Sequence, residues 1–383
     1  MPVVLPTELL RPIFGHVTNN KDLCSLALTC HTLREEAQRA MFQHVVVTIY
    51  TSKKQASTPF LNAIIASPNR LALMVRKINI KVYHIWEEQK QEHYIKTGEI
   101  YTGWLSEIGP KMAKALQLMT RITHLRVQYQ DWDPVDNKIT PWLESLLEGC
   151  AFRLKVLVWD VLTLDVENFI SKSLANQTDI CALVVSSESQ DFSDPQLQKL
   201  LGKLCKGLHT LSGSWEMIRS VLESGQTIQH LKLTSIPDSP RPSTTVLRKA
   251  LRGVTNLWSN APFARLDFGI ADLSNVVILQ IGCLFEEDYA AIVTLKKLTL
   301  LILTNNLNSP DNQAQMVKYL LSYSESLTEI YIEDWTMYSQ PYSCYTYNAV
   351  EHKVQCRGVP YWEMNTLRRP DALQFLDAID RTP

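Results

Sequence analysis

The residues whose types and spacing come closest to a chemical site lie near the C-terminal end. Cys344, His352 and Cys356 could together bind a metal ion such as zinc, because thiolates and imidazole nitrogens are its usual protein ligands. A fourth ligand and the short spacings of zinc-binding motifs are missing. Buried thiols and a surface histidine are therefore the better interpretation, and we expect no metal site.

The common signatures of enzymes are also missing. The sequence contains no GxSxG nucleophile elbow, no phosphate-binding P-loop, no HExxH zinc motif and no CxxC pair. We therefore expect no catalytic residues, no cofactor and no enzymatic activity, and an α/β enzyme is the least favoured alternative. The residues with a functional role should be those that contact other proteins.

An aromatic-rich segment at residues 335–369 is one candidate for such contacts, because Tyr and Trp are enriched at the energetic centres of protein interfaces. The candidates for binding a protein substrate are Trp335, Tyr338, Tyr342 and Tyr345. The alternative is that these rings pack over the preceding part of the chain and close its core. The residues alone leave both interpretations open.

Composition and charge restrict the class of partner. The 383 residues include 38 basic and 39 acidic side chains, for a formal net charge of -1, and no long run of one sign occurs. Nucleic acid is therefore not an expected partner. The longest uncharged apolar stretch, residues 273–285, is shorter than the ~20 residues that span a bilayer. The eight scattered cysteines and the lack of a signal peptide are typical of a cytoplasmic or nuclear protein.

Two kinds of segment alternate from residue 42 onward. Strand-like runs carry apolar residues at their first, fourth and sixth positions, and segments with helical periodicity, such as 195–205, lie between them. The middle residues of the runs are Val45, Ile78, Leu125, Leu157, Leu183, Leu211, Leu231, Leu266, Leu279, Leu301 and Ile330. Their mean separation is 28.5 residues, which is 285 residues over ten intervals. This period matches leucine-rich repeats, which have ~20 to 29 residues.

A unit of one strand and one amphipathic helix cannot bury its apolar face alone, so neighbouring units must stack. The sequence therefore predicts an α/β repeat, a solenoid with a parallel sheet. A doubly wound α/β domain is disfavoured because glycine is scarce, at 13 of 383 residues, and because the 13 residues from Leu266 to Leu279 are too few for a helical crossover. We expect a charged insertion near 84–104, an exposed proline-rich loop at 235–243 and a capping helix at 370–379.

Residues 5–44 do not follow the repeat. Leu5 to Phe14 predict a short helix, in which Pro12 should cost about 3 kcal/mol or kink the chain. Residues 19–22 supply capping side chains for a second helix. Apolar residues then recur in steps of three and four, at Leu23, Leu26, Cys30, Leu33, Ala37 and Ala40. One or two further amphipathic helices are the expected result.

This N-terminal segment resembles an F-box. The matching positions are Leu5, Pro6, Glu8, Leu9, Ile13, Phe14, Asp22, Leu23, Leu26, Ala27, Leu28, Cys30 and Leu33. Together with the repeats that follow, it resembles F-box proteins with irregular leucine-rich repeats, which are the substrate receptors of SCF-type ubiquitin ligases. The resemblance implies a three-helix module at 1–44, a solenoid at 45–334 and a C-terminal segment at 335–383.

The resemblance also implies the partners. The N-terminal module should bind the adaptor subunit and, through it, a cullin-RING ligase, while the repeats hold an unidentified protein substrate. The expected adaptor contacts are Leu5, Pro6, Leu9, Ile13, Phe14, Leu23, Leu26, Cys30 and Leu33. The alternative is an interaction scaffold of the same fold whose N-terminal helices only cap the solenoid, without any ligase.

Overall fold

A computed structural model describes most of the chain. The described residues are 6–17, 19–50, 57–83, 103–130, 146–161, 174, 177–186, 206–236, 244–266, 270–304, 310–333, 342–348, 353–360 and 363–364. They fall into two compact units, the first up to Ile180 and the second from Cys181 onward. In this part of the chain, no helix combines the length and the apolar character needed to cross a membrane.

The first unit begins with three short helices, α1 (Thr7–Gly15), α2 (Asn20–Ala27) and α3 (His31–Gln43). The Asn19 side chain accepts a hydrogen bond of 3.0 Å from the Lys21 amide, which satisfies a donor at the start of α2 as the capping residues predicted. Pro12 lies inside α1, and the helix ends three residues later.

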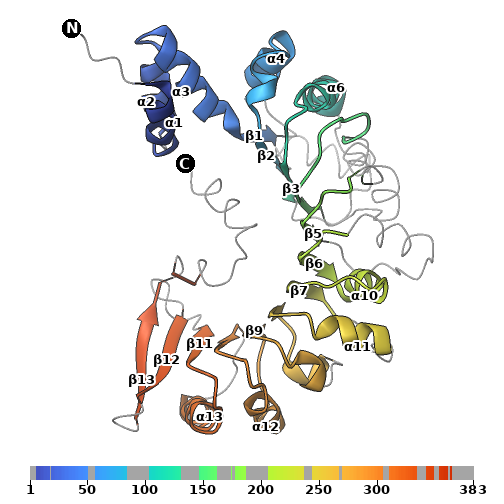
Figure 1. The fold of residues 1–383 in the computed structure, drawn as a ribbon, viewed down its shortest axis with the longest axis vertical. Helices are drawn as coiled ribbons and strands as arrows, with labels where there is room; N and C mark the ends of the chain where they lie inside the picture. Colours follow the sequence, from blue (N-terminus) through green and yellow to red (C-terminus); the bar gives the residue numbers. More distant parts are fainter. Residues whose placement is uncertain are drawn as a thin grey trace, which may run out of the picture. The chain divides into compact units, whose positions relative to one another are not determined.

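The rest of the first unit alternates strands and helices. The elements are β1 (His44–Tyr50), α4 (Thr58–Ala66), the 3-10 helix η1 (Ala72–Met74), β2 (Lys77–Tyr83), α6 (Gly103–Leu118), β3 (His124–Gln130) and β4 (Val156–Asp160). The strands are parallel and adjacent in chain order. Helices α4 and α6 lie on the same side of β1, β2 and β3 (Figure 1). The alternate apolar residues of each strand, such as Val47, Ile80 and Val127, are fully buried.

The second unit continues the same alternation. Its elements are β5 (Ala182–Ser186), β6 (Thr210–Ser214), α10 (Trp215–Glu223), β7 (His230–Ser235), α11 (Thr245–Leu251), β8 (Asn256–Ser259), η3 (Phe263–Arg265), η4 (Ile270–Leu273), β9 (Ile278–Ile281), η5 (Glu286–Asp288), α12 (Tyr289–Val293), β10 (Leu300–Leu303), α13 (Pro310–Tyr323), β11 (Glu329–Glu333), β12 (Tyr342–Asn348) and β13 (Lys353–Val359). Strands β5 to β11 follow one another in chain order and pair in parallel. Each unit is thus mixed α/β with a mainly parallel sheet, as predicted.

One predicted strand is wrong. The run Phe263/Leu266/Phe268 begins as the 3-10 helix η3, while the strand of this repeat is β8, with Leu257 at its centre. The pattern missed β8 because a buried polar residue, Ser259, occupies the third place, where its hydroxyl accepts a 3.1 Å bond from the Ala261 amide. With Leu257 in the series, the short separation of 13 residues disappears. Within each unit the strands lie side by side in chain order. This argues against a doubly wound sheet, because the strand order of such a sheet reverses direction at one point.

The run that ends in Gly213 is a true strand. Gly213 takes the third apolar place of β6, and a β-carbon built there would lie 2.1 Å from the Met217 Cε. The glycine therefore leaves room for Met217 of α10, which is itself fully buried.

The second unit ends in an antiparallel hairpin that the repeat pattern did not predict. Strand β12 pairs with β11, and β13 pairs with β12. The predicted helices at 195–205 and 370–379 lie outside the described residues, as do residues 84–102 of the expected insertion and residues 237–243 of the expected loop.

Candidate functional site

The N-terminal helices have a small core of their own. Leu10 and Phe14 lie one helical turn apart on α1 and are both buried. They belong to one apolar cluster with Leu23, Ala27 and Ala37 from the other two helices. This cluster explains why the three short helices fold together, since none is long enough to be stable alone.

The adjacent side of α1 remains exposed. Leu9 and Ile13, also one turn apart, are each 54% exposed, and Leu28 just after α2 is 82% exposed. Pro6 at the start of α1 is exposed as well. Single exposed leucines are ordinary on protein surfaces, but a pair at helical spacing beside the core pair makes this side of α1 a candidate contact face. We call Leu9, Ile13 and Leu28 the exposed apolar set.

The predicted adaptor contacts therefore divide into several groups. Pro6, Leu9, Ile13 and Cys30 are exposed, Leu26 and Leu33 are partly buried against the core, and Phe14 and Leu23 are buried within it. Leu5 lies outside the described residues. Leu28 was absent from the predicted contacts although it matched the F-box pattern, because it does not fall on the stripe that begins at Leu23.

Ion pairs tie the helices together. The carboxylate of Glu36, on α3, is almost fully buried and lies 3.5 Å from the Arg11 Nε of α1 and 3.6 Å from an Arg39 nitrogen. The Arg34 Nε donates a 3.2 Å hydrogen bond to the Ala27 carbonyl at the end of α2. These bonds fix α1 and the end of α2 relative to α3, so the exposed side chains have defined positions.

Helix α3 also connects the module to the first repeat. The Phe42 and Phe60 rings stack with centroids 5.9 Å apart, the Arg70 guanidinium donates to the Gln38 side chain, and the Arg76 amide donates to the Gln43 carbonyl. The module therefore contacts α4 and the segment that leads into β2 through α3, while Leu9 and Ile13 of α1 stay exposed.

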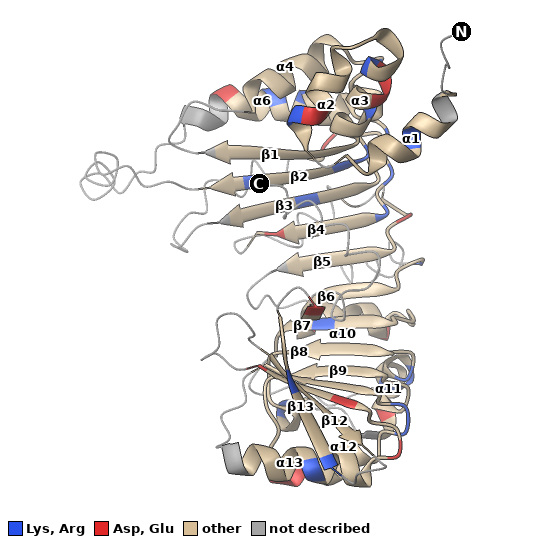
Figure 2. Ribbon diagram, turned by 90° about the vertical axis from the view of Figure 1, so that its left-hand side faces the viewer, with Lys and Arg blue, Asp and Glu red and all other residues tan. Residues whose placement is uncertain are grey.

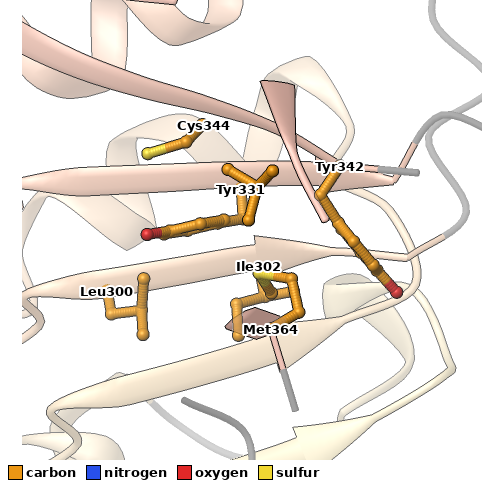
Figure 3. Packing of buried hydrophobic residues seen from close by; sticks show 7 residues of the cluster. Leu300, Ile302, Tyr331, Tyr342, Cys344 and Met364 are labelled. Carbon is orange, nitrogen blue, oxygen red and sulfur yellow. The ribbon is translucent and has the colours of Figure 1, made fainter. Parts of the chain in front are cut away.

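The aromatic candidates near the C-terminal end lie in a different setting. Tyr342 is fully buried in an apolar cluster at the hairpin, with Leu300, Ile302, Tyr331, Cys344, Val359 and Met364 (Figure 3). Its hydroxyl donates a 2.7 Å bond to a Glu333 carboxylate oxygen. Burial raises the pKa of the Tyr331 hydroxyl beside it. For Tyr342 this arrangement favours the alternative in which the ring closes the core of the last repeats.

Tyr345 is partly exposed, and its hydroxyl accepts a 2.9 Å bond from the Gln313 Nε2 of α13. Trp335, Tyr338 and His352 lie outside the described residues. Cys356 lies directly across the hairpin from Tyr345, so these two side chains are on the same face of the sheet. Cys344 is next to Tyr345 on the same strand and therefore points to the other face. Cys344 and Cys356 therefore cannot bind one metal ion.

The fold and the exposed apolar set define a class of protein: an α/β chain with a repeating, mainly parallel sheet, whose N-terminal helical module leaves apolar side chains exposed. An F-box-like family model matches residues 3–47, which include all three helices and the beginning of β1. The chain thus carries an F-box-like domain. No curated protein matches the chain.

Proposed function

We propose that this protein is the substrate-recognition subunit of an SCF-type, cullin-RING ubiquitin ligase, and that its repeats are irregular leucine-rich repeats. The observation that carries the proposal is the uncovered outer side of α1, within a domain that an F-box-like model matches. F-box domains in general bind the adaptor subunit of such ligases.

The exposed apolar set supplies the physical basis for adaptor binding. Fully burying a leucine or isoleucine side chain contributes about 1.5 to 3 kcal/mol, and Leu9 and Ile13 still expose about half of theirs, so each offers roughly 1 kcal/mol to a partner. Leu28 is almost entirely exposed and offers about 2 kcal/mol. The core residues Phe14 and Leu23 support this face from beneath.

The repeats would hold the substrate, and the ligase would supply the chemistry. In such an assembly the receptor contributes proximity and orientation, because a tethered target reaches the transferring enzyme at a high effective concentration. No catalytic side chain is required of this chain.

Co-purification with the adaptor tests the proposal. We expect the wild-type chain to retain the adaptor and the variant Leu9→Asp with Ile13→Asp to lose it, because each new carboxylate would have to be desolvated in an apolar contact. The matched control is Val246→Asp, which changes a side chain of similar exposure, 48%, on α11. The control should retain the adaptor. A wild-type chain that fails to bind, or a double variant that still binds, refutes the proposal.

The scaffold alternative remains the second candidate, because a specific observation favours it. Helix α3 contacts the first repeat through Phe42, Gln38 and Gln43, whose partners lie in α4 and in the segment that leads into β2, and contact with the first repeat is what a cap must make. A cap alone gives no reason for leaving Leu9 and Ile13 exposed. The same co-purification decides between the two, since a scaffold needs no adaptor.

A further inference from the structure

Strand β13 lies at the end of the sheet in the second unit. In the hairpin, β12 lies between β11 and β13, and among the described residues no strand pairs with the other side of β13 (Figure 1). A strand at the end of a sheet carries a row of backbone N–H and C=O groups that have no neighbouring strand. We call this side of residues 353–359 the outer edge of β13.

The outer edge is accessible along most of its length. Gln355, Cys356, Arg357 and Gly358 are four consecutive exposed residues. Gly358 is informative because a glycine has no side chain, so its exposed surface belongs to the backbone. Proteins commonly block such an edge with a proline, a bulge or charged side chains, and β13 contains neither a proline nor a bulge. Its protection therefore depends on charge.

Charge protects the outer edge only weakly. The charged side chains of β13 are Lys353 and Arg357, and basic residues are coloured blue in Figure 2. The Arg357 guanidinium donates hydrogen bonds of 2.6 and 3.3 Å to the two carboxylate oxygens of Glu363. This ion pair balances the arginine charge within the chain. Lys353, at the beginning of the strand, is left as the main charge of the edge.

Side-chain alternation restricts how two copies of β13 can pair. Residues directly opposite each other in an antiparallel pair point to the same face, so the two-fold axis must pass beside a residue that lies opposite itself. Among the registers that overlap five or more residues, pairing around Gln355 places Lys353 opposite Arg357, and pairing around Arg357 places two arginines opposite each other. Like charges directly opposite are destabilising. Pairing around Cys356 avoids both contacts, because Arg357 then lies opposite Gln355.

We propose that the outer edge of β13 binds the same edge of a second copy of this chain, as an antiparallel strand pair centred on Cys356. A second copy is favoured over an unrelated extended segment because the one register that overlaps all seven residues is also free of like-charge pairs. The two Cys356 α-carbons would lie about 4.5 to 5.5 Å apart. One strand pair is smaller than the interface of a stable dimer, so we expect a dissociation constant on the order of 10 µM. This dimer goes beyond the proposed function and requires no adaptor.

Sedimentation velocity of the full chain, from about 1 to 100 µM, tests the association. The charge variants are Gln355→Glu and Gln355→Arg, which place an opposite or a like charge directly across from Arg357 in the strand pair. The matched controls are Gln315→Glu and Gln315→Arg, which make the same changes at an exposed glutamine of α13.

We expect wild type to change from monomer to dimer as its concentration rises. Gln355→Glu should strengthen and Gln355→Arg should weaken the association, each by about fivefold, because every dimer contains two such pairs. Both controls should behave as wild type. A wild-type chain that stays monomeric at about 100 µM, or equal association of the two Gln355 variants, overturns the inference.

Crosslinking with a short bismaleimide tests the register. Each chain has one Cys356, so a link between two Cys356 thiols, identified by mass spectrometry, joins two copies. The link should form in wild type and in the variant Cys24→Ser with Cys30→Ser, which removes two other exposed thiols, and Cys356→Ser added to that variant should abolish the crosslinked dimer. A dimer that is linked only through other cysteines overturns the inference.

The crosslink also covers the case in which a Gln355 variant does not fold, as judged by circular dichroism, because it uses the unchanged strand. Adaptor binding is measured separately. A chain that binds the adaptor and stays monomeric disproves this inference alone, and a chain that forms the Cys356-linked dimer without binding the adaptor disproves only the proposed function.

Discussion

The neighbouring leucines of α1 permit a sharp test. The same substitution, leucine to alanine, can be made at Leu9, which is exposed, and at Leu10, which is buried in the same helix. Leu10 lies in the core with Phe14 and Leu23, whereas Leu9 is 54% exposed. Leu10→Ala should therefore destabilise the three-helix module, and Leu9→Ala should weaken adaptor binding without affecting the fold.

The expected magnitudes follow from burial. A buried leucine changed to alanine costs about 2 to 5 kcal/mol, because the transfer free energy is lost and a cavity remains. We expect about 3 kcal/mol for Leu10→Ala. An exposed leucine changed to alanine should cost less than about 0.5 kcal/mol. Since about 1.4 kcal/mol corresponds to a factor of ten, amides in α1 to α3 should exchange about 100-fold faster in Leu10→Ala.

Hydrogen exchange of the full chain, followed by mass spectrometry, measures this difference locally. Peptides from the second unit serve as the internal control, and their exchange should be the same in both variants. Equal protection in the two variants, or faster exchange in Leu9→Ala than in Leu10→Ala, would show that the assignment of core and outer face on α1 is wrong.

Three other predictions concern the repeats. Gly282→Ala should lower the stability of the second unit by about 1 to 3 kcal/mol in urea unfolding, because a β-carbon there would lie 2.2 Å from the Asn260 carbonyl oxygen. The control is Gly207→Ala, whose β-carbon would meet nothing within 4 Å and which should have no effect. Tyr342→Phe should cost about 1 to 2 kcal/mol through loss of its 2.7 Å bond to Glu333, and no loss would contradict the buried cluster. The pKa of His124 is about 4 in the folded chain, below its ordinary value of 6.5. Between these two values the unfolded chain binds more protons than the folded chain, so the free energy of unfolding should fall as the pH drops from 6.5 to 4. His124→Gln should make the free energy of unfolding less dependent on pH in this range.

The sequence predicted most strands of the repeat, although the fully apolar run Phe263/Leu266/Phe268 is not a strand. The middle positions of ten runs lie in strands, because burial against the helices requires large aliphatic side chains at Leu125, Leu231 or Leu301. It failed at β8, where Ser259 satisfies its polar group locally. It also missed the hairpin of β12 and β13, whose pairing depends on contact with β11 and not on the repeat period.

The candidate site was predictable in part. A three- and four-residue stripe marks which residues share a helix face, but it does not distinguish a face that packs inside the module from one that remains outside. Phe14 and Leu23 were therefore predicted as contacts although they form the core. Leu28 could be recognised only from the family pattern, since it follows the end of α2.

Titration of the purified chain with the purified adaptor tests the central claim most directly. We expect saturable binding by wild type, unchanged binding by Val246→Asp, and loss of binding by Leu9→Asp with Ile13→Asp, while circular dichroism shows all three proteins folded. A wild-type chain that does not bind the adaptor, or a folded Leu9/Ile13 variant with wild-type affinity, would contradict the account.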